Sequence, residues 1–382
     1  MALHRETITE VNLSAIRHNL KIIKRLVGPS VKIMSIVKAD AYGHGAIPCS
    51  KVAISSGSDY LGVGIVEEGI ELRDNGIQAP ILVMGGFFLD EIKNLIHNNL
   101  AAMLFSEKQL EELSKEAIRL KKKVSVHLKI DTGMNRLGVS PENFLKIVQK
   151  VIKNKNLSLE GICTHFSSAD EANPSYTMEQ LMRFDTALSQ LTEAGFKLPM
   201  IHCANSSAIL NFPESWRDLV RPGLTIYGAL PSLQFKSKME RLIKDSKQRF
   251  RPAIQWKTKI IQIKHHPKGA FLSYGNNYQT KKESLIATLP LGYADGLART
   301  LSNKIEMIIR GKRAPQVGNI CMDMCLIDVT DIPDIAEGDE AIIFGQQGDL
   351  SISVEEMAEQ AGLIPYEILC TVGKRVPRIY LS

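Results

Sequence analysis

The sequence predicts a (β/α)8 TIM-type barrel followed by a mostly β domain, and three observations carry this prediction. First, 382 residues with 44% hydrophobic and 23% charged side chains suffice for two domains with sizeable cores. Second, between residues 30 and 230 short apolar runs alternate with longer amphipathic stretches, as buried parallel strands alternate with helices. Third, after about residue 245 the runs are short and β-rich, with turn signals between them.

Eight apolar runs form the predicted barrel strands. They span residues 31–37, 60–65, 80–84, 101–105, 124–130, 159–166, 200–204 and 219–227. Helical periodicity fills the intervals, for example at 107–120 and 177–194, and Ser106 with Gln109 gives the first of these a capping-box start. An open doubly wound sheet is the alternative, but no GxGxxG follows the first strand. We therefore favour the barrel.

The β domain is predicted from runs separated by Gly-containing turns. These runs span residues 254–263, 285–289, 304–310, 314–317, 324–329 and 340–344. The segment 232–251, rich in Lys and Arg, is the expected connection, and a final helix is expected at 353–361. We thus expect a barrel domain over 1–240 and a β domain over 241–382, with about the first 12 residues pairing with the β domain.

Charge and cysteine usage limit the class of protein. A formal net charge of +6 is mild for this length and does not indicate a nucleic-acid partner. No 18-residue apolar run predicts a membrane span, and the amino terminus lacks an apolar signal core, so we expect a cytoplasmic protein. The cysteines have no zinc-like spacing, so we expect buried reduced thiols and no metal. They are Cys49, Cys163, Cys203, Cys321, Cys325 and Cys370.

Polar residues occur at the carboxyl ends of the predicted strands, where the active site of a barrel lies. In chain order they are Lys38, Lys129, Asp131, His165, Asn205, Ser206 and Arg221, the last within the predicted eighth strand. Lys38 follows two apolar residues directly and precedes the segment 39–45, ADAYGHG. A lysine there either binds a cofactor covalently or extends from the strand end into solvent, and the residues alone leave both interpretations open.

The segment 37–45, VKADAYGHG, closely resembles the cofactor-lysine motif of alanine racemases, which are pyridoxal-phosphate enzymes of fold type III. Asp40 stands where the family usually has Asn, which alters the local charge. The resemblance runs nearly the whole chain. Further matches, in the same order, are KIDTGMNRLG at 129–138, THF at 164–166, NS at 205–206, RPG at 221–223, YG at 227–228, SYG at 273–275, GYADG at 292–296, GNICMD at 318–323 and PYE at 365–367.

The resemblance implies that Lys38 and Tyr274 are catalytic bases on opposite faces of the substrate, Lys38 for D-alanine and Tyr274 for L-alanine. Removing the α-hydrogen of an amino acid at pH 7 needs pyridoxal phosphate, which delocalises the resulting charge. The pKa of Lys38, about 10.4 for a free lysine, must be lowered for this task. From the residues alone, Tyr274 fits better as a half-buried aromatic of a β hairpin.

The resemblance also assigns binding roles. Tyr42, Ser206, Tyr366 and the backbone of Gly223 and Leu224 are implied to hold the cofactor phosphate. Arg221 is implied to pair with the ring nitrogen, supported by His165. Without the resemblance, Ser206 could equally cap the helix that begins near residue 208, and His165 fits a structural histidine. The resemblance further implies that Arg136 and the backbone of Met322 bind the substrate carboxylate.

Lys129 has two interpretations. Some relatives carry a carbamate on this lysine, which reverses its charge and pairs it with the arginine that matches Arg136. The alternative is an unmodified lysine paired with Asp131. We favour the carbamate, because a bare cation beside Arg136 would be repelled. Cys321, next to Met322, is expected to line the pocket.

The family resemblance further implies a homodimer with shared active sites that supplies D-alanine for peptidoglycan. Tyr274 and Met322 would then enter each site from the neighbouring subunit. Three alternatives remain: a fold-type III amino-acid decarboxylase, a racemase of broader specificity, and a non-catalytic pyridoxal-phosphate binder. The motif 273–275 and Arg221 argue against the decarboxylase, and the β domain argues against the non-catalytic binder.

Overall fold

The computed structural model describes residues 5–242, 245 and 248–382, and these form two compact units. The first, called the barrel unit, comprises Arg17–Ala41 and Ala46–Ile226. The second, called the β unit, comprises the described parts of Met1–Ile16, Tyr42–Gly45 and Tyr227–Ser382. Each unit is built from segments that are distant in the sequence. The predicted site residues are divided between the two units.

The barrel unit contains an eight-stranded parallel sheet in the order β8-β7-β6-β5-β4-β3-β2-β9. The ends of the sheet meet, because Asp218 N donates to Ile201 O (3.0 Å) and Arg221 N donates to Ala204 O (2.9 Å). This closure confirms the predicted barrel. The strands are β2 (Lys32–Ile36), β3 (Tyr60–Val63), β4 (Ile81–Val83), β5 (Ala101–Leu104), β6 (Val124–Lys129), β7 (Leu157–Cys163), β8 (Met200–His202) and β9 (Leu219–Val220).

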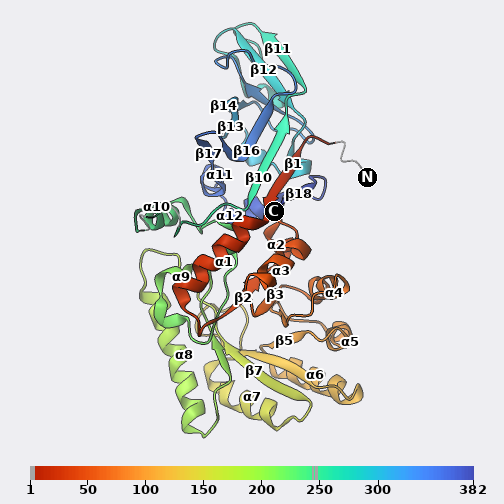
Figure 1. The fold of residues 1–382 in the computed structure, drawn as a ribbon, viewed down its shortest axis with the longest axis vertical. Helices are drawn as coiled ribbons and strands as arrows, with labels where there is room; N and C mark the ends of the chain where they lie inside the picture. The colour runs from red at the N-terminus through yellow and green to blue at the C-terminus, as the bar shows by residue number, and fades with distance from the viewer. Residues whose placement is uncertain (1–4, 243–244, 246–247) are drawn as a thin grey trace. The chain divides into compact units, whose positions relative to one another are not determined.

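Helices alternate with the strands along the chain and flank them (Figure 1). They are α1 (Leu13–Val27), α3 (Ala46–Ser55), α4 (Val66–Asp74), η1 (Leu89–Glu91), α5 (Ile92–His97), α6 (Glu107–Arg119), α7 (Pro141–Lys153), α8 (Ser175–Glu193), α9 (Ser206–Asn211) and η2 (Pro213–Ser215). Helix α7 buries Phe144, Ile147, Val148 and Val151, whose spacing places them on one face. The start of α6 is as expected, with Ser106 Oγ accepting from Gln109 N at 3.2 Å.

The eighth strand is much shorter than predicted. It ends at Val220, and Leu224–Tyr227 forms the 3-10 helix η3 instead. Pro222 has no N–H to extend the strand ladder, and Gly223 follows it, so the apolar run is interrupted there. Arg221 therefore follows the strand rather than lying within it.

The β unit contains a mostly antiparallel sheet in the order β11-β12-β15-β14-β13-β16-β10-β1-β18, with β17 paired to β16. The amino-terminal strand β1 (Ile8–Asn12) pairs antiparallel with β10 and parallel with β18. The other strands are β10 (Ile254–Lys259), β11 (Gln262–His266), β12 (Ser284–Leu289), β13 (Glu306–Ile309), β14 (Lys312–Val317), β15 (Cys325–Asp328), β16 (Glu340–Gln347), β17 (Leu350–Ile352) and β18 (Arg378–Leu381).

Several expectations for the β unit need correction. The single run at 254–263 is two strands, β10 and β11. The expected connection at 232–251 contains helix α10 (Leu233–Leu242), and residues 243, 244, 246 and 247 of it lie outside the described residues, as do residues 1–4 of the segment tested for a signal core. Helix α11 (Val354–Ala361) is not the last element, because α12 (Pro365–Thr371) and β18 follow it. Cys370 is exposed rather than buried.

Among the described residues, no helix combines the length and the apolar character needed to cross a membrane.

Candidate active site

Lys38 begins a short left-handed turn directly after β2. The next residues, Ala39, Asp40 and Ala41, have φ values of 52°, 52° and 54°, which non-glycine residues rarely adopt. Such a backbone costs about 1–2 kcal/mol per residue, so the surroundings must hold it in place. Asp40 contributes by accepting a hydrogen bond at Oδ1 from Ala46 N (2.7 Å) at the start of α3. An asparagine could accept the same bond, so Asp40 changes the charge but not this contact.

Glu68, in the first turn of α4, ties the turn to the neighbouring strand. Its Oε1 accepts from Ala39 N (2.6 Å), and its Oε2 accepts from Gly64 N (2.7 Å). Gly64 also lies close to the lysine, because a Cβ added there would be 3.6 Å from Lys38 Cβ and 3.3 Å from Glu68 Oε2. Glu68 thus fixes the backbone of the residue that follows Lys38. Glu68 was not among the residues predicted from the sequence.

Arg221 is buried, with 3% of its surface exposed, and neutral acceptors surround its guanidinium. NH1 lies 2.8 Å from His202 Nδ1, and NH2 lies 3.2 Å from His165 Nδ1. NH2 also donates to the backbone oxygens of Thr164 (2.8 Å) and Cys203 (3.0 Å). No carboxylate of the described residues forms an ion pair with Arg221, and its Nε makes no hydrogen bond with them. The Nε–H group therefore remains available for a ligand.

The two imidazoles beside Arg221 are neutral. Burial, and secondly the charge of Arg221, hold the pKa of His165 and of His202 well below the usual value of a histidine. Because arginine can only donate, each Nδ1 must accept, and each ring carries its proton on Nε2. The predicted partnership of His165 with Arg221 is present, and His202 is a second partner that was not predicted from the sequence.

Ser206 lies at the barrel mouth after β8, where hydroxyl and backbone groups gather. Its Oγ accepts from Gly223 N (2.9 Å), and it lies 3.2 Å from Thr225 Oγ1. The helix cap is Asn205, whose Oδ1 accepts from Ala208 N (3.0 Å), so Ser206 is not the N-cap. The structure therefore brings Ser206, Gly223 and the adjacent Leu224 together, as a phosphate cradle requires.

Lys129 is buried, with 7% of its surface exposed, and it does not pair with Asp131. Asp131 Oδ1 accepts instead from the backbone N–H groups of Gly133 (2.9 Å) and Asn135 (3.1 Å). Burial lowers the pKa of Lys129, and the charges of Arg221 and Arg136 lower it further, while Cys163 and Asp131 oppose them. Arg136 is exposed and forms no hydrogen bond or ion pair with other described residues. The unmodified Lys129–Asp131 pair is thus not formed.

The β unit brings two predicted tyrosines together. The ring centroids of Tyr42 and Tyr366 are 5.8 Å apart, and those of Tyr42 and Tyr227 are 5.2 Å apart. Gly43, with φ +78°, is required here, since a Cβ would lie 2.4 Å from Leu369 O. The sequence ADAYGHG therefore turns tightly enough to pack Tyr42 against these aromatic rings.

Tyr274 and Met322 line one hollow of about 620 Å³ in the β unit. The two residues are 71% and 54% exposed. The Tyr274 segment is fixed from both sides, because Ser273 Oγ donates to Asn319 O (2.6 Å) and Asn319 Nδ2 donates to Tyr274 O (2.7 Å). Within the described residues the Met322 N–H has no acceptor, which leaves it open to a carboxylate.

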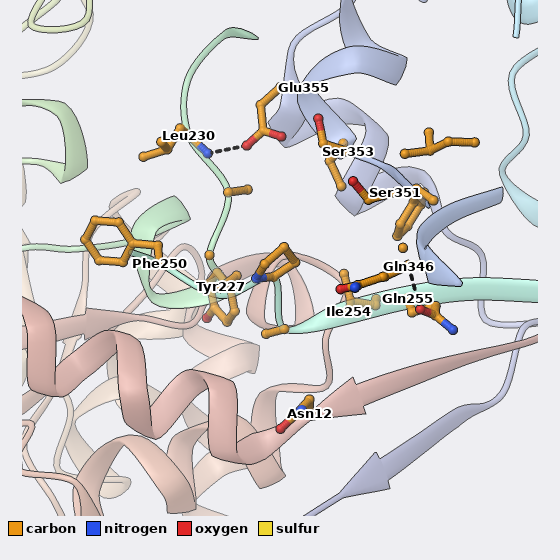
Figure 2. Close-up of a pocket in the computed structure, with 18 of the residues that line it drawn as sticks. Asn12, Tyr227, Leu230, Phe250, Ile254, Gln255, Gln346, Ser351, Ser353 and Glu355 are labelled. Atoms are coloured by element: carbon orange, nitrogen blue, oxygen red, sulfur yellow. Dashed lines mark hydrogen bonds between the residues drawn. The ribbon is translucent and has the colours of Figure 1, made fainter. Parts of the chain in front are cut away.

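A second cavity of the β unit, of about 450 Å³, contains none of the predicted site residues (Figure 2). Glu355 closes one wall by accepting from Leu230 N (2.8 Å), and its other oxygen lies 3.2 Å from Lys236 Nζ. The charges on this wall are therefore already paired. In the part of the chain that is described, no cluster of three or more His, Cys, Asp or Glu residues could hold a metal.

The residues that were not predicted have recognisable features in the sequence. His127 and His202 are polar residues inside two of the apolar strand runs, β6 and β8. A histidine that interrupts a run buried on both faces needs a hydrogen-bonding partner, and this requirement could have singled out both. Glu68 lies in the first turn of a helix next to a strand end, a position where acidic side chains bind backbone N–H groups.

Comparisons with known proteins agree along the whole chain. Residues 11–231 match the family model "Alanine racemase, N-terminal domain", and residues 253–380 match "Alanine racemase, C-terminal domain". The chain is 42% identical to a curated alanine racemase of Halothermothrix orenii, over 98% of this chain and 97% of that one. It is also 42% identical to the alanine racemase of Desulfovibrio desulfuricans, with 100% of both chains covered.

Solved structures give the same result. The chain is similar to an alanine racemase of Clostridium difficile, with a TM-score of 0.91 and 37% identity over 99% of this chain and 96% of that one. It is similar to the alanine racemase of Bacillus anthracis solved with bound L-Ala-P, with a TM-score of 0.90 and 36% identity over 100% and 96% of the two chains.

Proposed function

Because the chain belongs to the alanine racemase family, we propose that it interconverts L-alanine and D-alanine with pyridoxal 5′-phosphate as its cofactor. The observation that carries this conclusion is the match of both family domains, in order, across nearly the entire chain. Supply of D-alanine for peptidoglycan is typical of the family, and we assign this role to the protein.

The donors at the barrel mouth fit pyridoxal phosphate. Ser206 Oγ, to which the Gly223 N–H donates, and the Leu224 N–H are neutral hydroxyl and backbone groups of the kind that suits a phosphate. The family resemblance assigns Tyr42 and Tyr366, both of the β unit, to the same phosphate as hydroxyl donors. Lys38 supplies the amine for the covalent attachment. When bound, the cofactor withdraws the electron pair left at the α-carbon as the proton departs.

Arg221 determines how strongly that electron pair is withdrawn. Its available Nε–H can only donate, so it pairs with a ring nitrogen that carries no proton. With Arg221 as its partner, the ring would withdraw electrons less strongly, which would discourage side reactions. His165 and His202 hold the guanidinium from two sides, and their neutrality prevents repulsion between three cations in one buried space.

Lys38 and Tyr274 are the two proton-transfer groups in this proposal. Inversion at carbon needs a proton removed from one face and returned to the other, which a single base does poorly. We assign D-alanine deprotonation to the Lys38 amine and L-alanine deprotonation to the Tyr274 hydroxyl. The left-handed turn and Glu68 fix the start of the Lys38 segment, and Asn319 fixes the backbone of Tyr274.

Arg136 and the Met322 N–H are assigned to the substrate carboxylate, because both are donors without other partners among the described residues. A carbamate on Lys129 is part of the same proposal. Its formation removes a buried cation beside Arg136 and creates an anion that attracts the guanidinium.

The assembly we propose is a homodimer in which Tyr274 and Met322 act in the site of the partner subunit. Their exposure on one hollow supports this arrangement. Residues 1–240 and 241–382 would serve as cofactor-binding and site-completing domains, with β1 contributing to the second. A cytoplasmic location fits the buried free thiols Cys163, Cys203 and Cys325.

The activity is tested with purified holoenzyme and each alanine enantiomer in D2O. We expect loss of optical rotation from either enantiomer, deuterium at the α-carbon, and no release of carbon dioxide. Borohydride reduction followed by peptide mapping should place the cofactor on Lys38, and Lys38→Ala should abolish both the label and the activity. Carbon dioxide release without racemisation would instead identify an amino-acid decarboxylase.

A further inference from the structure

A line of buried polar side chains leads from Arg221 into the interior of the barrel. His202 contacts Arg221 through its Nδ1, and its Nε2 lies 2.9 Å from His127 Nδ1. His127 Nε2 in turn lies 4.0 Å from Glu160 Oε2. Both imidazoles are fully buried, and their rings meet edge to face with centroids 5.1 Å apart. None of the roles assigned above uses His127 or Glu160.

The direction of every proton in this line follows from one end. Arg221 can only donate, so His202 Nδ1 accepts and the His202 proton is on Nε2. That Nε2–H donates to His127 Nδ1, so the His127 proton is also on Nε2 and faces Glu160. Burial lowers the pKa of His127 to about 4, which keeps this ring neutral at physiological pH.

At the far end of this line, the Glu160 carboxylate only accepts hydrogen bonds. The hydroxyl of Tyr60 donates to Glu160 Oε1, and burial together with this hydrogen bond raises the pKa of Tyr60, so the phenol keeps its proton. Glu160 Oε2 is left to face the His127 ring. His127 Nε2 is buried and has no hydrogen-bond partner within the described residues, so the nearby carboxylate is the group that can stabilise its proton.

The local backbone is shaped for this arrangement. In the pairing of β6 with β7, Val126 lies opposite Leu159 and His127 opposite Gly161, so Glu160 is an extra, bulged residue. Gly161 provides the space for the ring, because a Cβ added there would lie 2.3 Å from His127 Nδ1. A bulge that redirects one carboxylate and a glycine that seats one imidazole are two independent features that serve the same contact.

The electrostatic need for such a line is clear at its other end. Arg221 is a buried cation with no carboxylate partner among the described residues, a costly arrangement unless neighbouring dipoles compensate. Two imidazoles oriented in series present their lone pairs toward the cation, and Glu160 attracts their N–H ends. Hydrogen bonds in such a chain polarise one another.

We propose that Glu160 is a positioning residue that acts through His127 and His202 to fix Arg221 as a donor toward the cofactor ring. The claim that Arg221 donates to the cofactor ring rests on the function proposed above. Replacing Glu160 with Gln leaves the Tyr60 hydroxyl on the amide oxygen and turns the amide N–H toward His127 Nε2. Two donors then face each other, so the Nε2–H orientation of His127 and His202 no longer avoids a donor–donor contact. The reversed Nδ1–H orientation, which moves that contact to Arg221, therefore becomes populated beside it.

The direct test is 15N NMR of histidine-labelled holoenzyme, since protonated and unprotonated imidazole nitrogens resonate in separate ranges. In the wild type we expect Nε2–H forms for His127, His165 and His202 at neutral pH. In Glu160→Gln we expect the Nδ1–H form to appear at His127 and His202. An Nδ1–H form of either ring in the wild type, or unchanged forms in Glu160→Gln, overturns the proposal. This readout does not depend on racemase activity, so it fails separately from the proposed function.

Kinetics provide the second readout. Glu160→Gln should lower kcat about tenfold, the scale of losses on changing residues behind a site, with KM for alanine within about twofold of the wild type. The control Glu193→Gln, at an exposed position on α8, should change neither kinetics nor the imidazole forms. Tyr60→Phe keeps the Glu160 carboxylate, so kcat and KM should stay within about twofold of the wild type and the imidazole forms should not change. Loss of kcat in Tyr60→Phe equal to that in Glu160→Gln, or an unchanged kcat in Glu160→Gln, contradicts the positioning role.

Discussion

His202 Nδ1 lies 2.8 Å from NH1 of Arg221, so a neutral imidazole rather than a carboxylate holds the buried guanidinium. The contact exists only while His202 is neutral and its Nδ1 carries no proton, because an imidazolium would face the cation with an N–H. The same condition applies to His165 and, one ring farther, to His127. Folding therefore depends on three histidines remaining neutral.

Acid should destabilise the protein through these histidines. Their pKa values in the folded state lie below the ordinary 6.5, so the unfolded chain binds more protons as pH falls below 6.5. Stability is therefore present above pH 6.5 and is lost as pH falls toward the folded pKa, which for His127 is about 4. Each histidine contributes a slope of up to about 1.4 kcal/mol per pH unit.

The measurement is urea unfolding between pH 7 and pH 5. His127→Phe should reduce the slope, whereas His97→Phe, at an exposed position of α5, should leave it unchanged. A free energy of unfolding that does not vary with pH in this range would contradict the neutral assignment.

Glu68→Gln should loosen the Lys38 segment. The amide can accept from Ala39 N or Gly64 N through one oxygen but not from both, so one charge-assisted hydrogen bond is lost. We expect about 1–3 kcal/mol less stability and weaker cofactor retention on dialysis. The matched control is Glu71→Gln, an exposed residue on the same helix. Equal effects of the two substitutions would show that the clamp has no special role.

Lys129 should carry a carbamate in the presence of carbon dioxide. Its lowered pKa leaves more neutral amine to attack CO2, and the positive charge of Arg136 would attract the product anion. Protein equilibrated with 13C-labelled bicarbonate should show one carbamate resonance by 13C NMR, which Lys129→Ala should remove. Persistence of that resonance in Lys129→Ala, or its absence from the wild type, would rule out the modification at this site.

Shared active sites should be visible by mixing inactive variants. Lys38→Ala and Tyr274→Phe each lack one proton-transfer group, so neither homodimer should racemise alanine. Subunits exchanged at equal ratio should form hybrid dimers with one complete site, restoring about a quarter of wild-type activity. Unmixed samples at the same total concentration serve as the control. No recovery, with hybrids demonstrated by native mass spectrometry, would place both residues in one subunit's site.

The sequence predicted the barrel well because each strand is buried on both faces and reads as a continuous apolar run. The eighth strand was predicted to be too long, because the apolar residues Leu224–Tyr227 pack in a 3-10 helix rather than in a sheet. The bulge at Glu160 depends on register between strands, which a single strand's pattern does not encode.

The site was predicted mainly from the family motif, because lysine, arginine and tyrosine at strand ends have ordinary structural explanations. His202 shows what remained hidden. A histidine in an apolar run indicates a need for a partner, but only the folded barrel brings His127 from one side and Arg221 from the other.

The two-base assignment is tested most directly by Tyr274→Phe with each alanine enantiomer in D2O. We predict that racemisation falls at least about 100-fold in both directions, while D-alanine still gains α-deuterium through Lys38 without changing hand. Racemisation at the wild-type rate from both enantiomers would contradict the account, because inversion would then proceed without the Tyr274 hydroxyl.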